Sequence, residues 1–102
     1  MSAIKKFQVT IDSDLESIAP GYLQNRVKDI AEIKQSLEKG DFDTIRILAH
    51  RMKGSGAGYG FDGITDIGRR MEVASKEQNA MVIAEAVEEL AVYVAGVEMV
   101  FE

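Results

Sequence analysis

The chain has 102 residues and a formal net charge of −5, with 12 Lys and Arg residues against 17 Asp and Glu residues. This balance argues against nucleic-acid binding, because phosphate backbones are bound by clustered basic side chains. The sequence contains no cysteine, which excludes disulfides, thiolate zinc sites and cysteine nucleophiles. The length fits one hydrophobic core, so we expect residues 1–102 to form a single domain.

The N-terminal residues MSAIKKFQVTID lack the apolar run of a signal peptide, and no stretch of the chain reaches the length of a membrane span. We therefore expect a cytoplasmic protein. Residues 7–11, FQVTI, alternate like a strand, but we identify no second strand to pair with them. A short helix is predicted from Asp12 to Ala19, with Asp12 or Ser13 as its N-cap.

The second predicted helix runs from Pro20 to about Lys39, since proline suits a first helical turn where its missing N–H needs no partner. Gly40 is well placed to end this helix in left-handed geometry. Apolar residues spaced by three and four positions give the helix one continuous stripe. These residues are Leu23, Val27, Ile30, Ile33 and Leu37.

Three further amphipathic helices follow. Asp41 or Asp43 caps the third, residues 61–76 form the fourth, and the last starts near Asn79 and runs almost to the C-terminus. The third and fourth helices are expected to bury Ile45, Leu48, Met52, Ile64, Ile67, Met71 and Ala74. The last has the spacing of a heptad seam at Ile83, Val87, Leu90, Val94, Val97 and Phe101. Together these patterns predict an all-α fold, an antiparallel up-down four-helix bundle with a short extra N-terminal helix.

The stretch HRMKGSGAGYGF, residues 50–61, combines the only histidine with four glycines at alternate positions. It does not match the phosphate-binding loop G-x-x-x-x-G-K-[ST], because Lys53 precedes Gly54 and does not follow the last glycine. It does not match the dinucleotide fingerprint G-x-G-x-x-G either, because Tyr59 stands where the third glycine is required. One histidine without cysteines cannot complete a zinc site. We therefore expect the chain to hold no metal and no cofactor.

On a helical wheel, Arg46, His50, Lys53 and Ala57 form a row about a third of a turn from the buried side. This row places the imidazole beside the core, within reach of solvent and flanked by two cations. A histidine with basic neighbours is also common on ordinary helix surfaces. The glycines that follow favour a functional reading, because each interior Gly costs about 0.5–1 kcal/mol relative to Ala.

Gly54 and Gly56 remove side-chain bulk next to the imidazole and would let another protein approach it. Close packing of two helices is the alternative explanation for them. Gly58 and Gly60 could simply end the third helix, and we expect Gly60 to be structural.

The segment His50-Arg51-Met52-Lys53-Gly54-Ser55, followed by Gly60-Phe61, resembles the H-x-x-K-G-S…G signature of histidine-containing phosphotransfer (HPt) domains. The resemblance covers about Pro20 to Lys76 and includes a glutamate, Glu72, on the fourth helix. It implies a four-helix bundle with the active histidine exposed on one helix. It also implies a phosphorelay carrier that accepts a phosphoryl group from a receiver-domain aspartate and passes it to another receiver.

The resemblance further implies that the chain binds no ATP, does not phosphorylate itself and relies on Mg²⁺ in the receiver. His50 would attack through Nε2, and Glu72 would hold the Nδ1 proton and orient the ring. Lys53 would offset charge on the transferring phosphoryl group. The residues expected to dock the partner are Arg46, Arg51, Gly54, Ser55, Gly56 and Ala57, with Ser55 also able to bond locally to the backbone.

Two other hypotheses remain open at this stage. The chain could be a non-catalytic docking module that binds a receiver or kinase and modulates its output. It could also be a helical dimerisation domain that uses the seam of the last helix, although we expect a monomer. Glu72 could be no more than a solvated helix residue.

Overall fold

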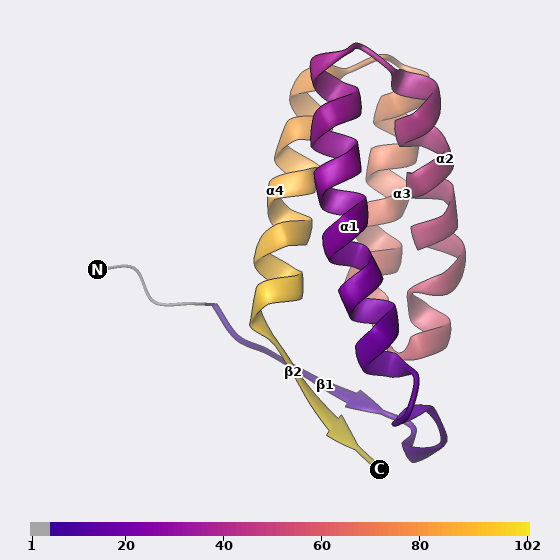
Figure 1. The fold of residues 1–102 in the computed structure, drawn as a ribbon, viewed down its shortest axis with the longest axis vertical. Coiled ribbons are helices and arrows are strands. Elements are labelled where there is room, and N and C mark those ends of the chain that lie inside the picture. Colours follow the sequence, from indigo (N-terminus) through magenta and orange to yellow (C-terminus); the bar gives the residue numbers. More distant parts are fainter. Residues whose placement is uncertain (1–4) are drawn as a thin grey trace.

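The structure, a computed structural model, describes residues 5–102. Its body consists of the helices α1 (Ala19–Glu38), α2 (Phe42–Ser55), α3 (Asp62–Lys76) and α4 (Ala80–Gly96), with the strands β1 (Phe7–Ile11) and β2 (Val97–Phe101) at the ends of the chain. Figure 1 shows the helices packed side by side. Short connections link α1 to α2 and α3 to α4 at one end of the bundle, and α2 to α3 at the other (Figure 1). The predicted mainly helical bundle is confirmed.

Local sequence signals set the helix ends. The Asp41 carboxylate accepts a hydrogen bond from the Thr44 N–H at 3.1 Å, so Asp41 is the N-cap of α2. Gly40 before it has φ 69°, the left-handed geometry expected after α1. Asn79 caps α4 by accepting from the Val82 N–H at 3.2 Å. Pro20 lies in the first turn of α1, as predicted.

The core positions predicted for α2 and α3 are all buried, namely Ile45, Leu48, Met52, Ile64, Ile67, Met71 and Ala74. The stripe predicted for α1 is partly wrong. Ile33 is buried, but Val27 is 49% exposed, and the side chains of Ala19 and Tyr22 are buried instead. The helix is therefore rotated slightly from the predicted orientation, because the Tyr22 ring stacks on Tyr59 and Phe61 at the end of the bundle.

The all-α prediction is wrong at the two ends of the chain. β1 and β2 pair in parallel, with Phe7 opposite Val97 and Ile11 opposite Phe101. The last helix therefore stops at Gly96. A Cβ on Gly96 would overlap the Lys5 carbonyl oxygen, so only glycine lets the chain pass directly across the end of α4.

The predicted N-terminal helix from Asp12 to Ala19 is reduced to a single 3₁₀ turn, Ser13–Leu15. Asp12 caps this turn, with its carboxylate accepting from the Asp14 N–H at 2.8 Å. The Ser13 N–H donates to the Glu102 carbonyl at 2.8 Å. The backbone here thus continues the pairing of the strands, which competes with a longer helix.

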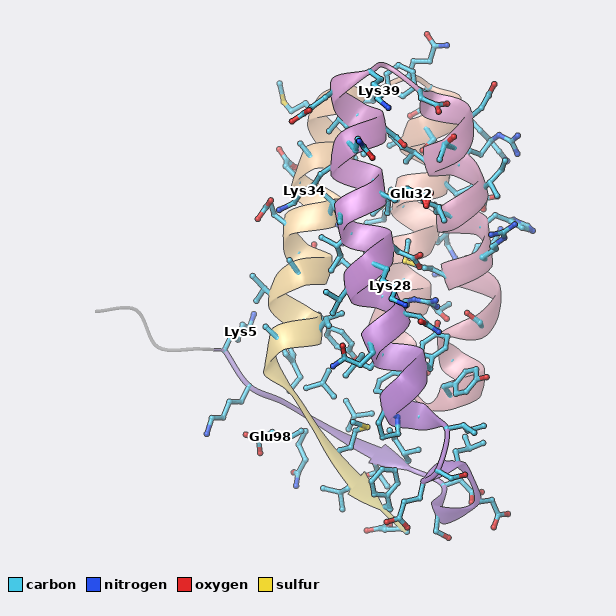
Figure 2. The ribbon with its side chains drawn as sticks, viewed as in Figure 1. Lys5, Lys28, Glu32, Lys34, Lys39 and Glu98 are labelled. Carbon is cyan, nitrogen blue, oxygen red and sulfur yellow. The ribbon has the colours of Figure 1, made fainter. Side chains whose placement is uncertain are left out.

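The outward face of α1 is charged, and Figure 2 shows Lys28, Glu32 and Lys39 along it, with Lys34 at the side towards α4, where it pairs with Glu88. Within residues 5–102, no helix has both the length and the apolar character needed to cross a bilayer.

Candidate functional site

His50 lies on α2 at the border between its buried and exposed sides. Ala49 and Met52 next to it are fully buried, whereas the His50 side chain is 65% exposed. The amphipathic pattern of α2 therefore places the imidazole beside the core and open to solvent, as the helical wheel predicts.

Glu72 on α3 contacts both His50 and Lys53. Its Oε2 lies 2.7 Å from His50 Nδ1, and its Oε1 lies 2.6 Å from Lys53 Nζ. The Glu72 side chain is only 8% exposed, so the alternative that it is a solvated helix residue is wrong. A single buried carboxylate thus holds both side chains, which come from one turn of α2.

The electrostatics of this trio fix its hydrogen-bonding pattern. The hydrogen bond from Lys53, assisted by the one from His50, lowers the pKa of Glu72 to about 2 even though burial acts in the opposite direction. Glu72 is therefore ionised at neutral pH and can only accept hydrogen bonds. His50 Nδ1 must then carry a proton, which leaves the lone pair of the neutral ring on Nε2.

The C-terminal part of α2 is tied to the start of α3 by Thr65. Its Oγ1 accepts from the Ala57 N–H at 2.8 Å and donates to the Lys53 carbonyl at 3.2 Å. Gly56 is buried here, and a Cβ on it would lie 2.8 Å from both the nitrogen and the Oγ1 of Thr65. The prediction that Gly56 clears space for a partner is wrong, because this glycine permits close packing of α3.

The other predicted docking residues have different environments. Gly54, Ala57 and Arg51 are exposed, while Arg46 is half-buried. A Cβ on Gly54 would meet nothing within 4 Å, so the fold itself does not require glycine there. Gly60 has φ 95° and is structural as expected, but it ends the 3₁₀ turn Ala57–Tyr59 and not α2, which stops at Ser55.

Ser55 is held within the chain. Its hydroxyl donates to the Arg51 carbonyl at 2.8 Å, and its Oγ lies 2.7 Å from the Tyr22 hydroxyl on α1. The expected local bond to the backbone is therefore present, and a second bond links the motif to α1.

The sequence reasoning missed three residues around the imidazole. Ile47 is 43% exposed one turn before His50 and adds an apolar side chain to the open face of α2. Thr65 and Gly68 on α3 contact α2 beside Lys53. The pattern T-x-x-G-x-x-x-E places Thr65, Gly68 and Glu72 on one face of the helix. This spacing could have revealed Thr65 and Gly68.

The seam of the last helix is not available to another chain in the way the dimerisation hypothesis requires. Its residues Ile83, Val87 and Leu90 are buried in the core of this chain. Val97 and Phe101 belong to β2 and not to the helix. Dimerisation through a continuous helical seam is therefore excluded by the fold.

Comparison with known protein families extends these observations to most of the chain. The family model for the Hpt domain matches residues 21–99. This region contains α2, α3 and α4 complete and nearly all of α1, so it reaches well beyond the segment Pro20–Lys76 that carries the sequence resemblance. Comparisons with curated proteins and with solved structures gave no match. The chain, with its exposed histidine on a helical bundle, belongs to the Hpt domain family.

Proposed function

We propose that this protein is a phosphorelay intermediate. His50 accepts a phosphoryl group from the aspartate of one receiver domain and passes it to the aspartate of another. Membership of the Hpt family supports phosphotransfer in two-component signalling. The observation that carries the assignment to His50 is its 65% exposed ring with Nδ1 held 2.7 Å from a buried carboxylate. In this proposal the helices form an antiparallel up-down bundle that presents the imidazole as a phosphohistidine site.

The transfer step needs no proton to leave the protein. The Nε2 lone pair of His50 attacks phosphorus, and the N–P bond forms as the bond from phosphorus to the receiver aspartate oxygen breaks. The electron pair of that bond stays on the aspartate carboxylate. Nδ1 keeps its proton, so the phosphorylated ring is cationic, and Glu72 stabilises this cation through the existing hydrogen bond. The reverse step delivers the group to the second receiver.

Lys53 supplies positive charge next to the reacting nitrogen. It lies one turn after His50, and its side chain is 34% exposed, so the ammonium can contact phosphoryl oxygens while remaining close to Glu72. The Mg²⁺ that neutralises the rest of the charge belongs to the receiver, and this chain contributes no cofactor. The reaction therefore uses residues of both proteins.

The open face of α2 is the docking surface in this proposal. Arg51 and the half-buried Arg46 offer positive charge to the acidic rim of a receiver. Ile47 offers an apolar contact, and the empty space at Gly54 lets the receiver approach the imidazole closely. Ala57 is also exposed and adds only a methyl group to this surface. We expect the chain to act as a monomer in the cytoplasm.

The test is a transfer screen against phosphorylated receivers from the source organism. We expect acid-labile label to move onto the wild-type chain and onto Lys28→Gln, an exposed control on α1. No label should move onto His50→Gln. Label on His50→Gln, or none on the wild type from any cognate receiver, would overturn the proposal. Receiver binding by a wild type that accepts no label, with the binding unaffected by His50→Ala, would instead support the docking-module hypothesis.

A further inference from the structure

One face of α3 makes three separate contacts with a single residue of α2. Thr65, Gly68 and Glu72 are spaced by three and four positions, so they share one side of the helix. Thr65 Oγ1 donates to the Lys53 carbonyl at 3.2 Å, and Glu72 Oε1 binds Lys53 Nζ at 2.6 Å. Between these two bonds, Gly68 faces the backbone nitrogen of Lys53. Lys53, one turn after the reactive histidine, is thus bonded at its carbonyl and its ammonium, and its amide faces the space left free by Gly68.

At Gly68 the backbone of α3 packs directly against the backbone of α2. A Cβ at this position would lie 2.7 Å from Lys53 N, 2.9 Å from the Ala49 carbonyl oxygen and 3.2 Å from Lys53 Cα. Those atoms belong to the α2 backbone and cannot rotate away. For a Cβ on Gly63, also in α3, the three nearest atoms instead all belong to the ring of Tyr93, a side chain that can move. Any side chain at Gly68 must therefore push the two helices apart.

The displacement required is large compared with what the site can tolerate. Ordinary van der Waals contact begins near 3.4 Å, so a Cβ placed 2.7 Å from Lys53 N requires a shift of several tenths of an ångström. Glu72 lies one turn after Gly68 on the same face and moves with it. A shift of that size would take its bonds to His50 and Lys53, now 2.7 and 2.6 Å, towards the limit of hydrogen bonding.

We propose that Gly68 is a positioning residue for phosphotransfer. By allowing the backbones of α2 and α3 to touch, it sets the helix spacing at which one carboxylate can hold both His50 Nδ1 and Lys53 Nζ. Its role in the reaction rests on the proposed function, whereas its effect on the imidazole does not. The two parts are therefore tested by separate measurements.

The first measurement reads the tautomer of the imidazole by ¹⁵N NMR, at a pH where the ring is neutral. His50 is the only histidine, so its ring signals need no assignment. We expect the Nδ1–H tautomer in the wild type and in the matched control Gly63→Ala. In Gly68→Ala the weaker bond to Glu72 should give a mixture with the Nε2–H tautomer. An unchanged tautomer in Gly68→Ala would overturn the proposal.

The second measurement is a double-mutant cycle on the transfer rate. Gly68→Ala should slow transfer about tenfold, as expected for weakening one charge-assisted hydrogen bond. In the Glu72→Ala background the same substitution should cause no further loss, because its effect passes through Glu72. Equal losses in both backgrounds would overturn the proposal. If the wild type accepts no phosphoryl group, the proposed function fails and the tautomer measurement still decides the role of Gly68.

Folding of the variant is checked by circular dichroism. If Gly68→Ala loses helical signal, both measurements are repeated in trimethylamine N-oxide, which favours the folded state. A variant that stays unfolded there would assign Gly68 to the stability of the whole fold and would overturn the positioning role.

Discussion

The α2–α3 and α1–α4 interfaces of this bundle are built in different ways. At α2–α3, Gly56 and Gly68 bring backbone against backbone beside a buried carboxylate. At α1–α4, an open groove is lined by Gln24 and by aliphatic side chains, namely Leu23, Val27, Ile30, Ala91, Val94 and Ala95. Flexible side chains can absorb small displacements of a helix, whereas contacting backbones cannot. His50, Lys53 and Glu72, whose hydrogen bonds need fixed distances, lie at the α2–α3 interface, where the helices cannot shift.

Each interface also carries an ion pair. Lys53 and Glu72 are 2.6 Å apart across α2–α3, and the carboxylate is buried. Lys34 and Glu88 are 2.9 Å apart across α1–α4, and both side chains are about half exposed. Exposed pairs contribute about 0–1 kcal/mol and are screened by salt. We therefore expect the two pairs to differ in stability and in their response to pH.

The largest difference in stability between the two parts of the bundle should appear when a glycine is replaced by alanine. Gly56→Ala places a Cβ 2.8 Å from Thr65 N and 2.9 Å from the Phe61 carbonyl oxygen. We expect it to lower the free energy of unfolding by about 1–3 kcal/mol. Gly21→Ala in α1 meets nothing within 4 Å and should be neutral or stabilising by up to about 1 kcal/mol. Urea unfolding of both variants measures this, and equal stabilities would contradict the proposed difference in packing.

A smaller effect is expected from removing the buried charge. In Glu72→Gln the amide oxygen can still accept from Lys53, but its NH₂ can bond to His50 Nδ1 only if the ring adopts the Nε2–H tautomer, and both bonds lose the carboxylate charge. We expect a loss of about 1.5 kcal/mol at pH 7. Glu88→Gln, the control at the α1–α4 interface, should lose well under about 1 kcal/mol.

The loss in Glu72→Gln should depend on pH. The folded chain lowers the pKa of Glu72 from 4.5 to about 2, so the unfolded chain binds the proton more readily between these values. The stabilisation from the carboxylate is therefore complete above about pH 5 and disappears as the pH falls towards 2. Denaturant titrations of wild type and Glu72→Gln should converge over this range. A constant difference down to the lowest pH that keeps both folded would contradict the electrostatic account.

The smallest effect on stability is expected at the open glycine of the site. Gly54→Gln has space for its side chain and, because Gln is the better helix former, should be neutral or raise the free energy of unfolding by up to about 0.5 kcal/mol. It should nevertheless slow phosphotransfer by obstructing the receiver. Val27→Gln, at an exposed position of the α1–α4 groove, should leave transfer unchanged. Equal transfer rates in both variants would show that the space at Gly54 has no role in docking.

The parts of this molecule that follow from local chemistry could be predicted from the sequence. The N-cap Asp41, the left-handed Gly40 and the exposed position of His50 each depend on a few neighbouring residues. Glu72 was expected near the imidazole through a family resemblance, and the structure adds that it also binds Lys53. That shared contact depends on how closely two helices approach, which no local pattern specifies.

The missed features all depend on contacts between distant segments. The spacing of Val94, Val97 and Phe101 suits a helix, whereas Val97, Met99 and Phe101 alternate as in a strand, and the pairing of β2 with β1 decides between them. The position of Gly56 near His50 in the sequence suggests partner access, but its close neighbour, Thr65, lies on another helix. A glycine in a helix signals a close approach, but the sequence does not tell which chain segment approaches.

The parallel pairing of β1 and β2 has a consequence for the kinetics of the molecule. Phe7 pairs with Val97, 90 positions further along the chain, and the whole bundle forms the crossover between the strands. Closing a loop of this length is entropically costly until the helices have assembled, so we expect the strands to pair after the rate-limiting step of folding. Substitutions in the strands should then accelerate unfolding and leave the folding rate nearly unchanged. The two short strands would thus determine the lifetime of the native state.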